Sequence, residues 1–509
     1  MNGDVSTVTL VNGGAVPLAE LPILDFETFA EELVGEVARD GRVAAFFATP
    51  AAGDQGFDLF ALVARDWRGH LALMRTRVKE SFPSLTPRCP QLHLFEREIA
   101  EQYGIVPEGH PWFKPVRFQP SWRPGRDAWG RDPGRHPIPG DMPFYRVEGE
   151  EVHEVAVGPV HAGVIEPGHF RFQCHGETVM HLEISLGYQH RALERQLIGG
   201  PHPSTRHRME SVAGDTSVGH MTAYSQILET LADAPPSPRS EALRLLALEL
   251  ERLANHVGDI GALAGDVGFL PTASFCGRLR GDYLNMTAAL CGSRFGRGLI
   301  RPGGVAFDIE PPLAAELERK LSAVARDTHG AVELFFDTPS VLARLEGTGT
   351  LGTDTAEELG VVGVAARACG LVRDVRLHHP MGAWRGAFDS VIIEETGDVF
   401  ARAKVRRREI QASLELLSRG LKDLPEGALQ IPVGRVRPEA LAVSLVEGWR
   451  GEIVHVAITD AQGKFARYKI VDPSFHNWSG LAMALRGEQI SDFPLCNKSF
   501  NLSYCGFDL

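Results

Sequence analysis

A stretch rich in proline and glycine divides this 509-residue chain into two parts. Proline has no backbone N–H to donate and glycine loses much entropy on ordering, so such a stretch sustains neither a helix nor a central strand. A chain of this length also exceeds what one hydrophobic core usually holds. We therefore predict a domain over residues 1–118, a linker over 119–145 and a second domain over 146–509. The linker is defined by Pro120, Pro124, Gly125, Gly130, Pro133, Gly134, Pro137, Pro139, Gly140 and Pro143.

The first part alternates between helical and extended patterns. Residues 25–38 carry apolar side chains at helical spacing, with acidic residues early, where the helix dipole favours them. Residues 42–48, 57–65 and 71–78 are apolar runs of strand length. These elements predict a small α+β domain.

A motif follows near the end of the first part. A proline–serine turn at residues 81–86 precedes a short helix that carries Glu96, Arg97 and Glu98, and then come an aromatic-Gly-Ile and a Gly-His-Pro at 109–111. On their own, the three charged residues are equally typical of a solvated helix face. The four elements in this order resemble the signature of the 30 kDa-type subunit of complex I.

The second part contains an unusual run of small residues over 209–224. Small residues let a backbone come close to a cofactor or a partner surface. A tight contact between two helices, with one satisfied histidine, is the alternative interpretation. The residues concerned are Ala213, Gly214, Ser217 and Gly219, followed by His220, Thr222 and Tyr224.

The remaining segments of the second part extend the resemblance. A long helix is predicted over residues 243–261, where leucines recur on one stripe, and its Glu249, Glu251 and Arg252 are expected at the surface. From about residue 155 onward, the order of motifs resembles the 49 kDa-type subunit of complex I and the large subunit of nickel–iron hydrogenases. The fused arrangement is most similar to the large subunit of formate hydrogenlyase and other group 4, energy-converting hydrogenases. The resemblance implies an α+β chain whose second domain is mainly α-helical, with a small β region at its start.

The resemblance to hydrogenases places a nickel–iron site at positions that hold no cysteine here. Such a site needs four soft thiolates in two Cys-x-x-Cys pairs. By the family pattern, the four ligand positions are occupied by Ala213, Thr216, Ser474 and Asn477. The seven cysteines are scattered with no Cys-x-x-Cys, and Cys496 and Cys505 lie past the motif. We therefore expect no nickel, and no other metal, in this chain.

The resemblance to complex I implies a different use of the same cavity. Tyr224 matches the tyrosine that hydrogen-bonds a quinone in that family, and Asp266 of an Asp-x-Gly matches the supporting aspartate. Together with His220, they are the expected catalytic residues, because a tyrosine hydroxyl near a carboxylate can donate and pass a proton. His161 and Arg294 are the expected cofactor-binding residues.

Two family histidines are missing from this pattern. Pro167 stands where complex I has the second histidine of its motif near the start of the domain, and Gly296 stands where it has a histidine facing the terminal cluster. Quinone binding therefore stays an open alternative.

Composition excludes several function classes. The net charge is −13 and no basic tract suggests a nucleic-acid partner, since residues 402–408 are more typical of a solvated helix face. The sequence contains no run of eighteen apolar residues, so we expect no membrane span, and the first residues lack the pattern of a secretory signal. The glycine pattern at 347–352 follows no good strand, so we interpret it as a turn of the family and not as a nucleotide site.

These observations predict a large core subunit of a complex I-like, hydrogenase-related oxidoreductase. It would couple electron transfer from an iron–sulfur cluster in a small partner subunit to chemistry or conformational change in a metal-free cavity. It would lie in the cytoplasm on the inner face of the membrane, held by antiporter-like subunits, with a formate dehydrogenase module as a further candidate partner. The alternatives are a quinone-reducing NADH dehydrogenase-type subunit, an active hydrogenase subunit, which the missing cysteines disfavour, and a structural bridging subunit.

Overall fold

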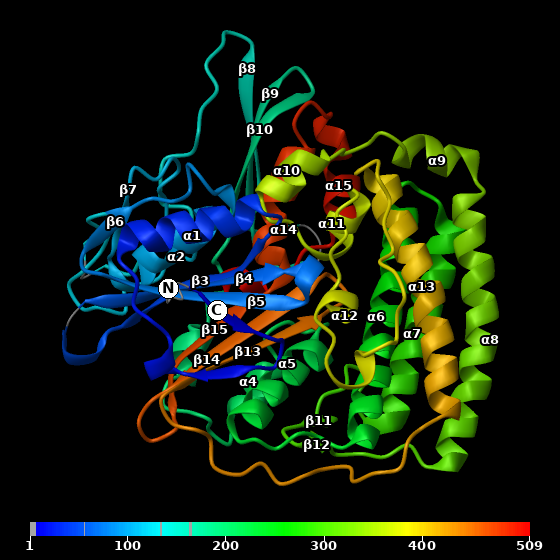
Figure 1. Ribbon diagram of the computed structural model, residues 1–509. Coiled ribbons are helices and arrows are strands. Elements are labelled where there is room, and N and C mark those ends of the chain that lie inside the picture. The colour runs from blue at the N-terminus through cyan, green and yellow to red at the C-terminus, as the bar shows by residue number, and fades with distance from the viewer. Residues whose placement is uncertain (1–6, 55, 133–134, 162–164) are drawn as a thin grey trace.

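The computed structural model describes residues 7–54, 56–132, 135–161 and 165–509. Two four-stranded sheets lie at the centre, a helical bundle stands on one side, and a three-stranded sheet projects from the top of the view (Figure 1). The predicted α+β class is confirmed. Among the helices of these residues, none combines the length and the apolar character needed to cross a bilayer.

The first sheet is built from the predicted strands of the N-terminal part. Its antiparallel order is β1 (Val8–Leu10), β5 (His70–Val78), β4 (Phe57–Arg65) and β3 (Arg42–Pro50). Helix α1 (Phe26–Ala38) begins where the Asp25 carboxylate accepts the Thr28 backbone N–H. Its buried Phe29 and Leu33 join the core against this sheet.

The motif after this sheet is a buried turn and not a solvated face. Helix α2 (His93–Tyr103) follows β6 (Ser81–Pro83), which pairs in parallel with β7 (Val106–Glu108). Glu96 accepts hydrogen bonds from the Ser84 and Thr86 hydroxyls and from a backbone N–H between them. The solvated-face alternative for this helix is therefore wrong, because Glu96 bonds to the turn after Pro83 and Glu98 accepts from the buried Lys469.

The second central sheet joins distant parts of the chain. Its order is β15 (Phe465–Val471), β14 (Glu452–Thr459), β13 (Ala440–Glu447) and β2 (Ala15–Pro17). The sequence predicted only a small β region at the start of the second part. That region is the projecting sheet of β8 (Val152–Val157), β9 (His169–His175) and β10 (Thr178–Ser185).

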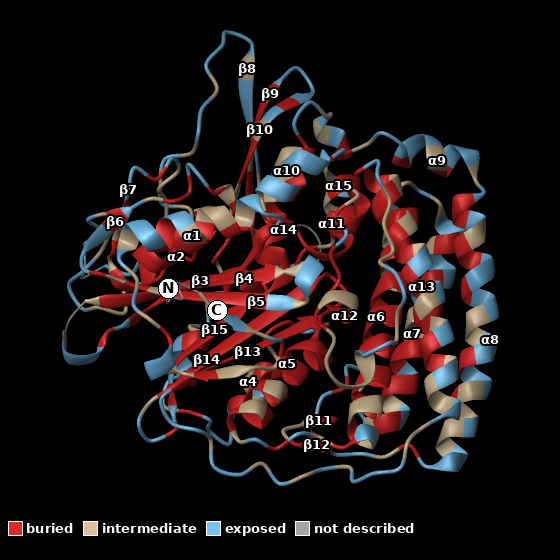
Figure 2. Cartoon of the chain, in the orientation of Figure 1, coloured by how far each residue is buried: buried red, intermediate tan, exposed pale blue. Residues whose placement is uncertain are grey.

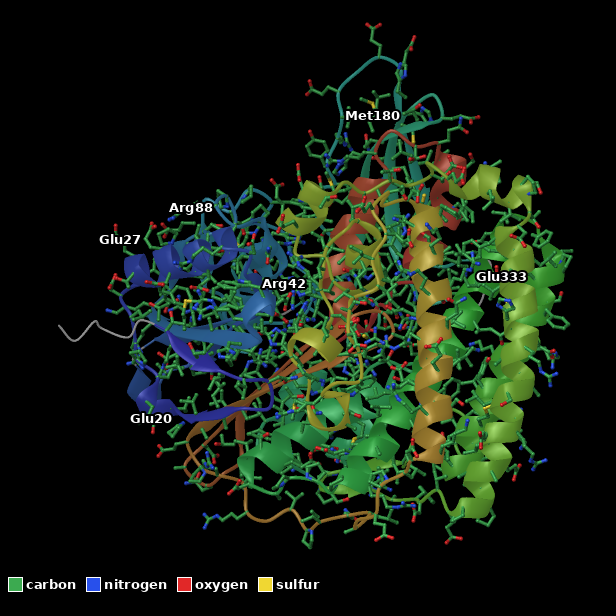
Figure 3. All side chains as sticks on the ribbon, turned by 45° about the vertical axis from the view of Figure 1, so that its right-hand side comes forward. Glu20, Glu27, Arg42, Arg88, Met180 and Glu333 are labelled. Atoms are coloured by element: carbon green, nitrogen blue, oxygen red, sulfur yellow. The ribbon has the colours of Figure 1, made fainter. Side chains whose placement is uncertain are left out.

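The two parts of the chain share one interior. Strand β2 adds an N-terminal segment to the C-terminal sheet. Arg42 of β3 points inward (Figure 3) and donates to Glu452 of β14 at 2.7 Å. Between β7 and β8 the described residues form no regular helix or strand, as the proline and glycine content predicted.

The bundle consists of α6 (Pro238–Asp266), α7 (Leu270–Cys291), α8 (Pro311–Phe336) and α13 (Val399–Lys422). The leucine stripe of α6 is buried, and Figure 2 shows exposed residues gathered on the outer faces, α8 among them. Two predictions are corrected here. Glu249, Glu251 and Arg252 of α6 are buried, and so are Arg402 and Arg406 of α13, because each of these charges has polar partners inside the protein. Within residues 402–408, Arg408 is exposed as predicted.

Short elements complete the fold. The glycine pattern at 347–352 lies between two helices, α9 and α10, so no strand precedes it, as predicted. Helix α5 (Ser217–Leu231) packs against β13 and β14. The others are α3 (Leu193–Leu197), α4 (Thr205–Met209), β11 (Ile300–Arg301), β12 (Gly304–Val305), α9 (Pro339–Leu345), α10 (Thr353–Glu358), α11 (Gly363–Ala368), α12 (Val375–His378), α14 (Pro473–Ala484) and α15 (Phe493–Phe500).

Candidate functional site

A chain of hydrogen bonds runs through the buried interior at the start of α5. His220 Nε2 lies 3.4 Å from the Asp472 carboxylate, and His220 Nδ1 lies 3.1 Å from His455 Nε2. His455 Nδ1 in turn lies 2.9 Å from the Tyr468 hydroxyl. We call these four residues the buried relay. None is more than 1% exposed, and they come from α5, β14, β15 and the N-cap of α14.

Electrostatics give the buried relay a direction. Burial, followed by the neighbouring His220, lowers the pKa of His455 well below its usual range, so that ring is neutral. Burial alone would raise the pKa of Asp472, but the His220 hydrogen bond and the Arg450 charge outweigh it and leave that pKa below its usual value. An ionised Asp472 accepts from His220 Nε2–H. His220 Nδ1 then accepts from His455, and His455 accepts from the Tyr468 hydroxyl.

Tyr224 lies beside the buried relay, and Asp266 does not. The Tyr224 ring is 6.2 Å from the Tyr468 ring, and burial raises the pKa of its hydroxyl above the usual value. Asp266 is the exposed last residue of α6. Partial burial raises its pKa above the usual value, and the Lys498 charge offsets part of that rise. The structure does not bring Asp266 to His220 and Tyr224.

A second Asp-x-Gly in the same helix is the buried one. Asp259 accepts from Arg406 at 2.7 Å and from Asn501 at 2.5 Å. Only Asp266 was expected from the sequence, but the same Asp-x-Gly pattern also occurs at Asp259, and burial distinguishes the two. His455, Tyr468 and Asp472 were also missed as site residues. They come from β14, β15 and the N-cap of α14, and no local pattern predicts that these segments lie beside α5.

The two expected cofactor-binding residues lie elsewhere. His161, in the loop after β8, has its Nε2 3.0 Å from the Gly168 carbonyl oxygen. Arg294, after α7, is exposed to solvent. Neither residue has a contact with the buried relay among the described residues.

The positions that hold the nickel ligands in the hydrogenase pattern use their polar side-chain atoms within the protein here. The Thr216 hydroxyl donates to Asp215 at 3.1 Å, and Ser474 Oγ accepts the Ser503 backbone N–H at 2.9 Å. The Asn477 amide pairs with both backbone groups of Val362, and Ala213 offers no donor at all. Hydroxyl and amide groups are not soft anionic ligands, so these residues do not fit a nickel–iron centre.

Arg450 supplies a positive charge beside Asp215 and Asp472. The Arg450 guanidinium donates to both Asp215 oxygens, at 2.7 and 2.8 Å. Burial would lower the pKa of Arg450, but Asp215 and Asp472 raise it above its usual value. The Arg450 charge thus balances the partly exposed Asp215 carboxylate and also favours the ionised form of the buried Asp472.

Cys505 is nearer to this place than its position in the sequence indicated. Its Sγ and ligand atoms of His220 and Asp472 lie within 4.8 Å of one another. Burial raises the pKa of the Cys505 thiol well above its usual range, which keeps the sulfur protonated. One protonated thiol does not replace four thiolates.

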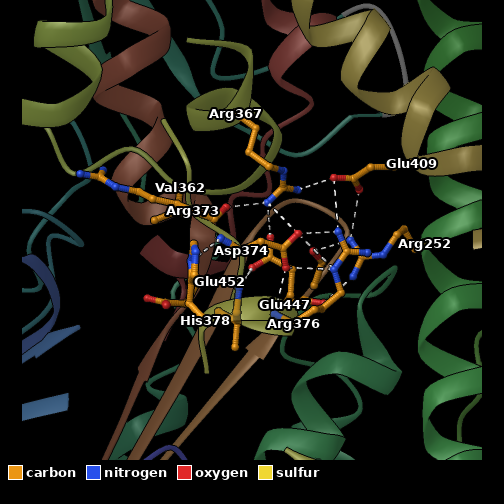
Figure 4. Close-up of polar contacts among 12 residues, drawn as sticks. Arg252, Val362, Arg367, Arg373, Asp374, Arg376, His378, Glu409, Glu447 and Glu452 are labelled. Atoms are coloured by element: carbon orange, nitrogen blue, oxygen red, sulfur yellow. Dashed lines mark hydrogen bonds and ion pairs between the residues drawn. The ribbon is translucent and has the colours of Figure 1, made fainter. Parts of the chain in front are cut away.

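A network of buried ion pairs lies between α6, α11, α12 and α13 (Figure 4). Glu409 of α13 accepts from Arg367 at 2.6 Å and from His256 at 2.9 Å. Glu447, at the end of β13, accepts from Arg367 at 2.7 Å. No local pattern marked Glu409 or Glu447, because each is one acid among charged or apolar neighbours.

Comparison with family models identifies both parts of the chain. Residues 36–138 match the respiratory-chain NADH dehydrogenase 30 Kd subunit. Residues 266–440 and 431–508 match the respiratory-chain NADH dehydrogenase 49 Kd subunit. Helix α5, with His220 and Tyr224, precedes the matched residues of the second model.

Individual proteins extend the similarity across most of the chain. Formate hydrogenlyase subunit 5 of Escherichia coli is 29% identical over 84% of this chain and 76% of its own length. NADH-quinone oxidoreductase subunit 4 of Thermus thermophilus is 28% identical over 67% of this chain and 90% of its own length. A chain of the archaeal membrane-bound sulfane sulfur reductase has the same fold, with a TM-score of 0.66 and 22% identity over 72% of this chain and 100% of that chain.

Hydrogenase-4 component G of Escherichia coli is also 29% identical, over 83% of this chain and 75% of its own length. The order of the two matched family models along the chain is the order expected of a fusion. The chain therefore carries fused complex I 30 kDa-type and 49 kDa-type domains and is homologous to formate hydrogenlyase subunit 5 and hydrogenase-4 component G.

Proposed function

We propose that this chain is the large core subunit of a complex I-like, hydrogenase-related oxidoreductase complex at the membrane, and that the buried relay moves protons in response to electrons. The electrons would arrive on an iron–sulfur cluster of a small partner subunit. The observation that carries the proposal is the continuous chain of donors and acceptors from Tyr468 to Asp472. Its homologues are core subunits of hydrogenase-type and NADH-quinone oxidoreductase complexes.

The relay can carry one proton by shifting each hydrogen along the chain. The Tyr468 proton moves to His455 Nδ1, the His455 Nε2 proton moves to His220 Nδ1, and the His220 Nε2 proton moves to Asp472. Burial raises the pKa of Tyr468 well above its usual range, so the tyrosine releases its proton only as another one arrives. Negative charge on a nearby cluster would favour the uptake of that second proton by Tyr468, because the charge attracts a proton into the low-dielectric interior.

Replacing Tyr468 with phenylalanine tests this proposal. The ring and its packing stay, but the relay loses its terminal O–H, so turnover of the whole complex is expected to fall by about 10²-fold or more. The pH dependence of the residual turnover should change as well. The measurement is the steady-state redox activity of the purified complex over a range of pH, with assembly checked by gel filtration.

Asp266→Asn is the matched control, because this carboxyl is exposed at the end of α6. It is expected to leave turnover unchanged. If Tyr468→Phe complexes assemble normally and retain the turnover and pH profile of the parent complex, the buried relay has no part in the reaction. A purely structural, bridging role would then be favoured.

Quinone reduction is the second candidate function, and Tyr224 is the residue that favours it. Tyr224 is buried, and burial raises the pKa of its hydroxyl more than the Thr205 hydrogen bond lowers it. The hydroxyl therefore stays protonated and could donate a hydrogen bond to a quinone carbonyl. A quinone reductase predicts quinone-dependent turnover that Tyr224→Phe weakens through KM. A proton relay without quinone predicts that Tyr224→Phe leaves KM unchanged.

Elemental analysis tests the expected absence of nickel. The complex is expected to contain iron from its partner subunit and nickel only at background level, since the four ligand positions have no thiolates. A formate hydrogenlyase preparation, measured in parallel, is the control that contains nickel. Stoichiometric nickel, or uptake of hydrogen by the complex, would restore the active-hydrogenase alternative.

A further inference from the structure

A cavity of about 240 Å³ lies where α2, β10, α14 and the proline-rich linker meet. None of its lining residues belongs to the buried relay. At ~30 Å³ for each water molecule, its volume equals that of about eight waters, and its wall is mainly apolar. The apolar wall includes Leu94, Trp112, Phe144, Ile184, Trp478 and Met483.

One buried cation in this wall has no carboxylate within ion-pair distance among the described residues, although Glu101 and Glu183 lie near enough to act on its charge. Arg97 is 8% exposed; its Nε donates to the Lys114 carbonyl at 2.6 Å and one Nη donates to the Pro115 carbonyl at 3.0 Å. Within the described residues, its other Nη makes no hydrogen bond and no carboxylate forms an ion pair with the guanidinium. Burial lowers the pKa of Arg97 to about 10, which still leaves it charged at neutral pH.

The other charged groups around the cavity leave an excess of positive charge. Lys114 donates to Glu183 at 2.5 Å, so this pair is neutral. Arg486 is exposed, with His181 as its hydrogen-bond partner at 3.5 Å. Burial lowers the pKa of His93 to about 3 and that of His110 to about 4, so both rings are neutral. The cavity therefore has an apolar body, a buried cation and a second cation at its exposed edge.

We propose that this cavity binds a small organic anion with an apolar body, of the class of aromatic or short aliphatic carboxylates. A buried guanidinium whose hydrogen bonds go only to backbone carbonyls keeps an unused N–H group, and a carboxylate is the group that its fork of N–H donors fits best. The apolar wall would hold the body of the ligand, as in most small-molecule sites. The Ser479 hydroxyl, 3.1 Å from His93 Nε2, gives a further polar contact at the cavity wall. This site is independent of the proposed relay.

The test compares 1-naphthoate with 1-naphthalenemethanol, which has the same body without the charge. Each is titrated into the full-length protein by calorimetry. We expect naphthoate to bind at least tenfold more tightly and to raise the temperature of unfolding, because only the carboxylate pairs with Arg97. Arg97→Gln should remove the difference between the two compounds. Equal affinities in the parent protein, or no binding of either compound, would overturn the proposal.

A second variant tests the same cavity if Arg97→Gln folds poorly. Met483→Trp adds bulk to the cavity wall without removing the cation and should abolish binding of both compounds. Met180→Trp is the matched control, since Met180 is an exposed residue of β10 that lies at the upper edge of Figure 3. Naphthoate binding that survives Met483→Trp would place the ligand outside this cavity and would refute the assignment.

Discussion

Replacing Glu409 with alanine is expected to destabilise the protein by about 3–5 kcal/mol, because it leaves buried cations without their partner. Both carboxylate oxygens of Glu409 are used: one accepts from Arg367 (Figure 4) and the other from His256. Glu409 and Arg367 are fully buried. Burial alone would raise the pKa of Glu409, yet Arg367 and Arg376 hold it well below its usual value, so the charge is present at every ordinary pH.

Glu333→Ala is the control for this prediction. Glu333 also lies on a bundle helix and pairs with an arginine, Arg407, but both side chains are partly exposed (Figure 3). Exposed pairs contribute about 0–1 kcal/mol, so this variant should unfold close to the parent. The measurement is the urea midpoint of unfolding, followed by far-UV circular dichroism. Similar midpoints for Glu409→Ala and Glu333→Ala would mean that the buried network relaxes to admit water.

The elements that local patterns specify were predictable from the sequence. The acids early in residues 25–38 and the apolar runs that follow gave α1, β3, β4 and β5 in order. Asp25 caps α1 through its own side chain, and the leucines of α6 face the bundle core, as their spacing indicated. These features depend on residues within one or two turns of each other, which is the range over which periodicity carries information.

The buried charges and the site could not be predicted in the same way. A carboxylate in a basic helix is typical of a solvated face unless its partners are known, and the partners of Glu409 lie on α6 and α11. The buried relay likewise joins α5 to β14 and β15, more than two hundred residues later in the chain. Family motifs named His220 and Tyr224, which lie in and beside the buried relay, and Asp266, which lies at the exposed end of α6. The motif alone could not separate Asp266 from Asp259, because both precede x-Gly in one helix.

The second large prediction concerns the contact between the two parts of the chain, where Glu194 of α3 is fully buried. It accepts from Arg467 at 2.8 Å, from Lys469 at 3.1 Å and from the Ile470 backbone N–H at 3.0 Å, all of β15. Lys469 also donates to Glu98 of α2 at 2.6 Å, so the cluster joins the 30 kDa-type and 49 kDa-type parts. Glu194→Ala leaves these two cations underneutralised and should cost about 3–5 kcal/mol.

The same variant is expected to show a loss of stability that depends on pH. Burial would raise the pKa of Glu194, but Lys469 and Arg467 lower it far below the value of about 4.3 expected in the unfolded chain. A depressed pKa contributes stability above the unfolded value, and that contribution is lost as the pH falls below it. The difference in unfolding free energy between the parent and Glu194→Ala should therefore be full at pH 7 and shrink below about pH 4.

Glu177→Ala removes an exposed glutamate from the turn between β9 and β10 and is the matched control, expected to match the parent at both pH values. A Glu194→Ala protein whose loss of stability is the same at pH 7 and pH 3 would show that the cluster acts through packing and not through charge. A protein with no loss at either pH would mean that water enters and solvates Arg467 and Lys469. Because β15 also supplies Tyr468, a loosened Glu194 cluster should lower the turnover of the complex together with its stability, whereas Tyr468→Phe should lower turnover alone.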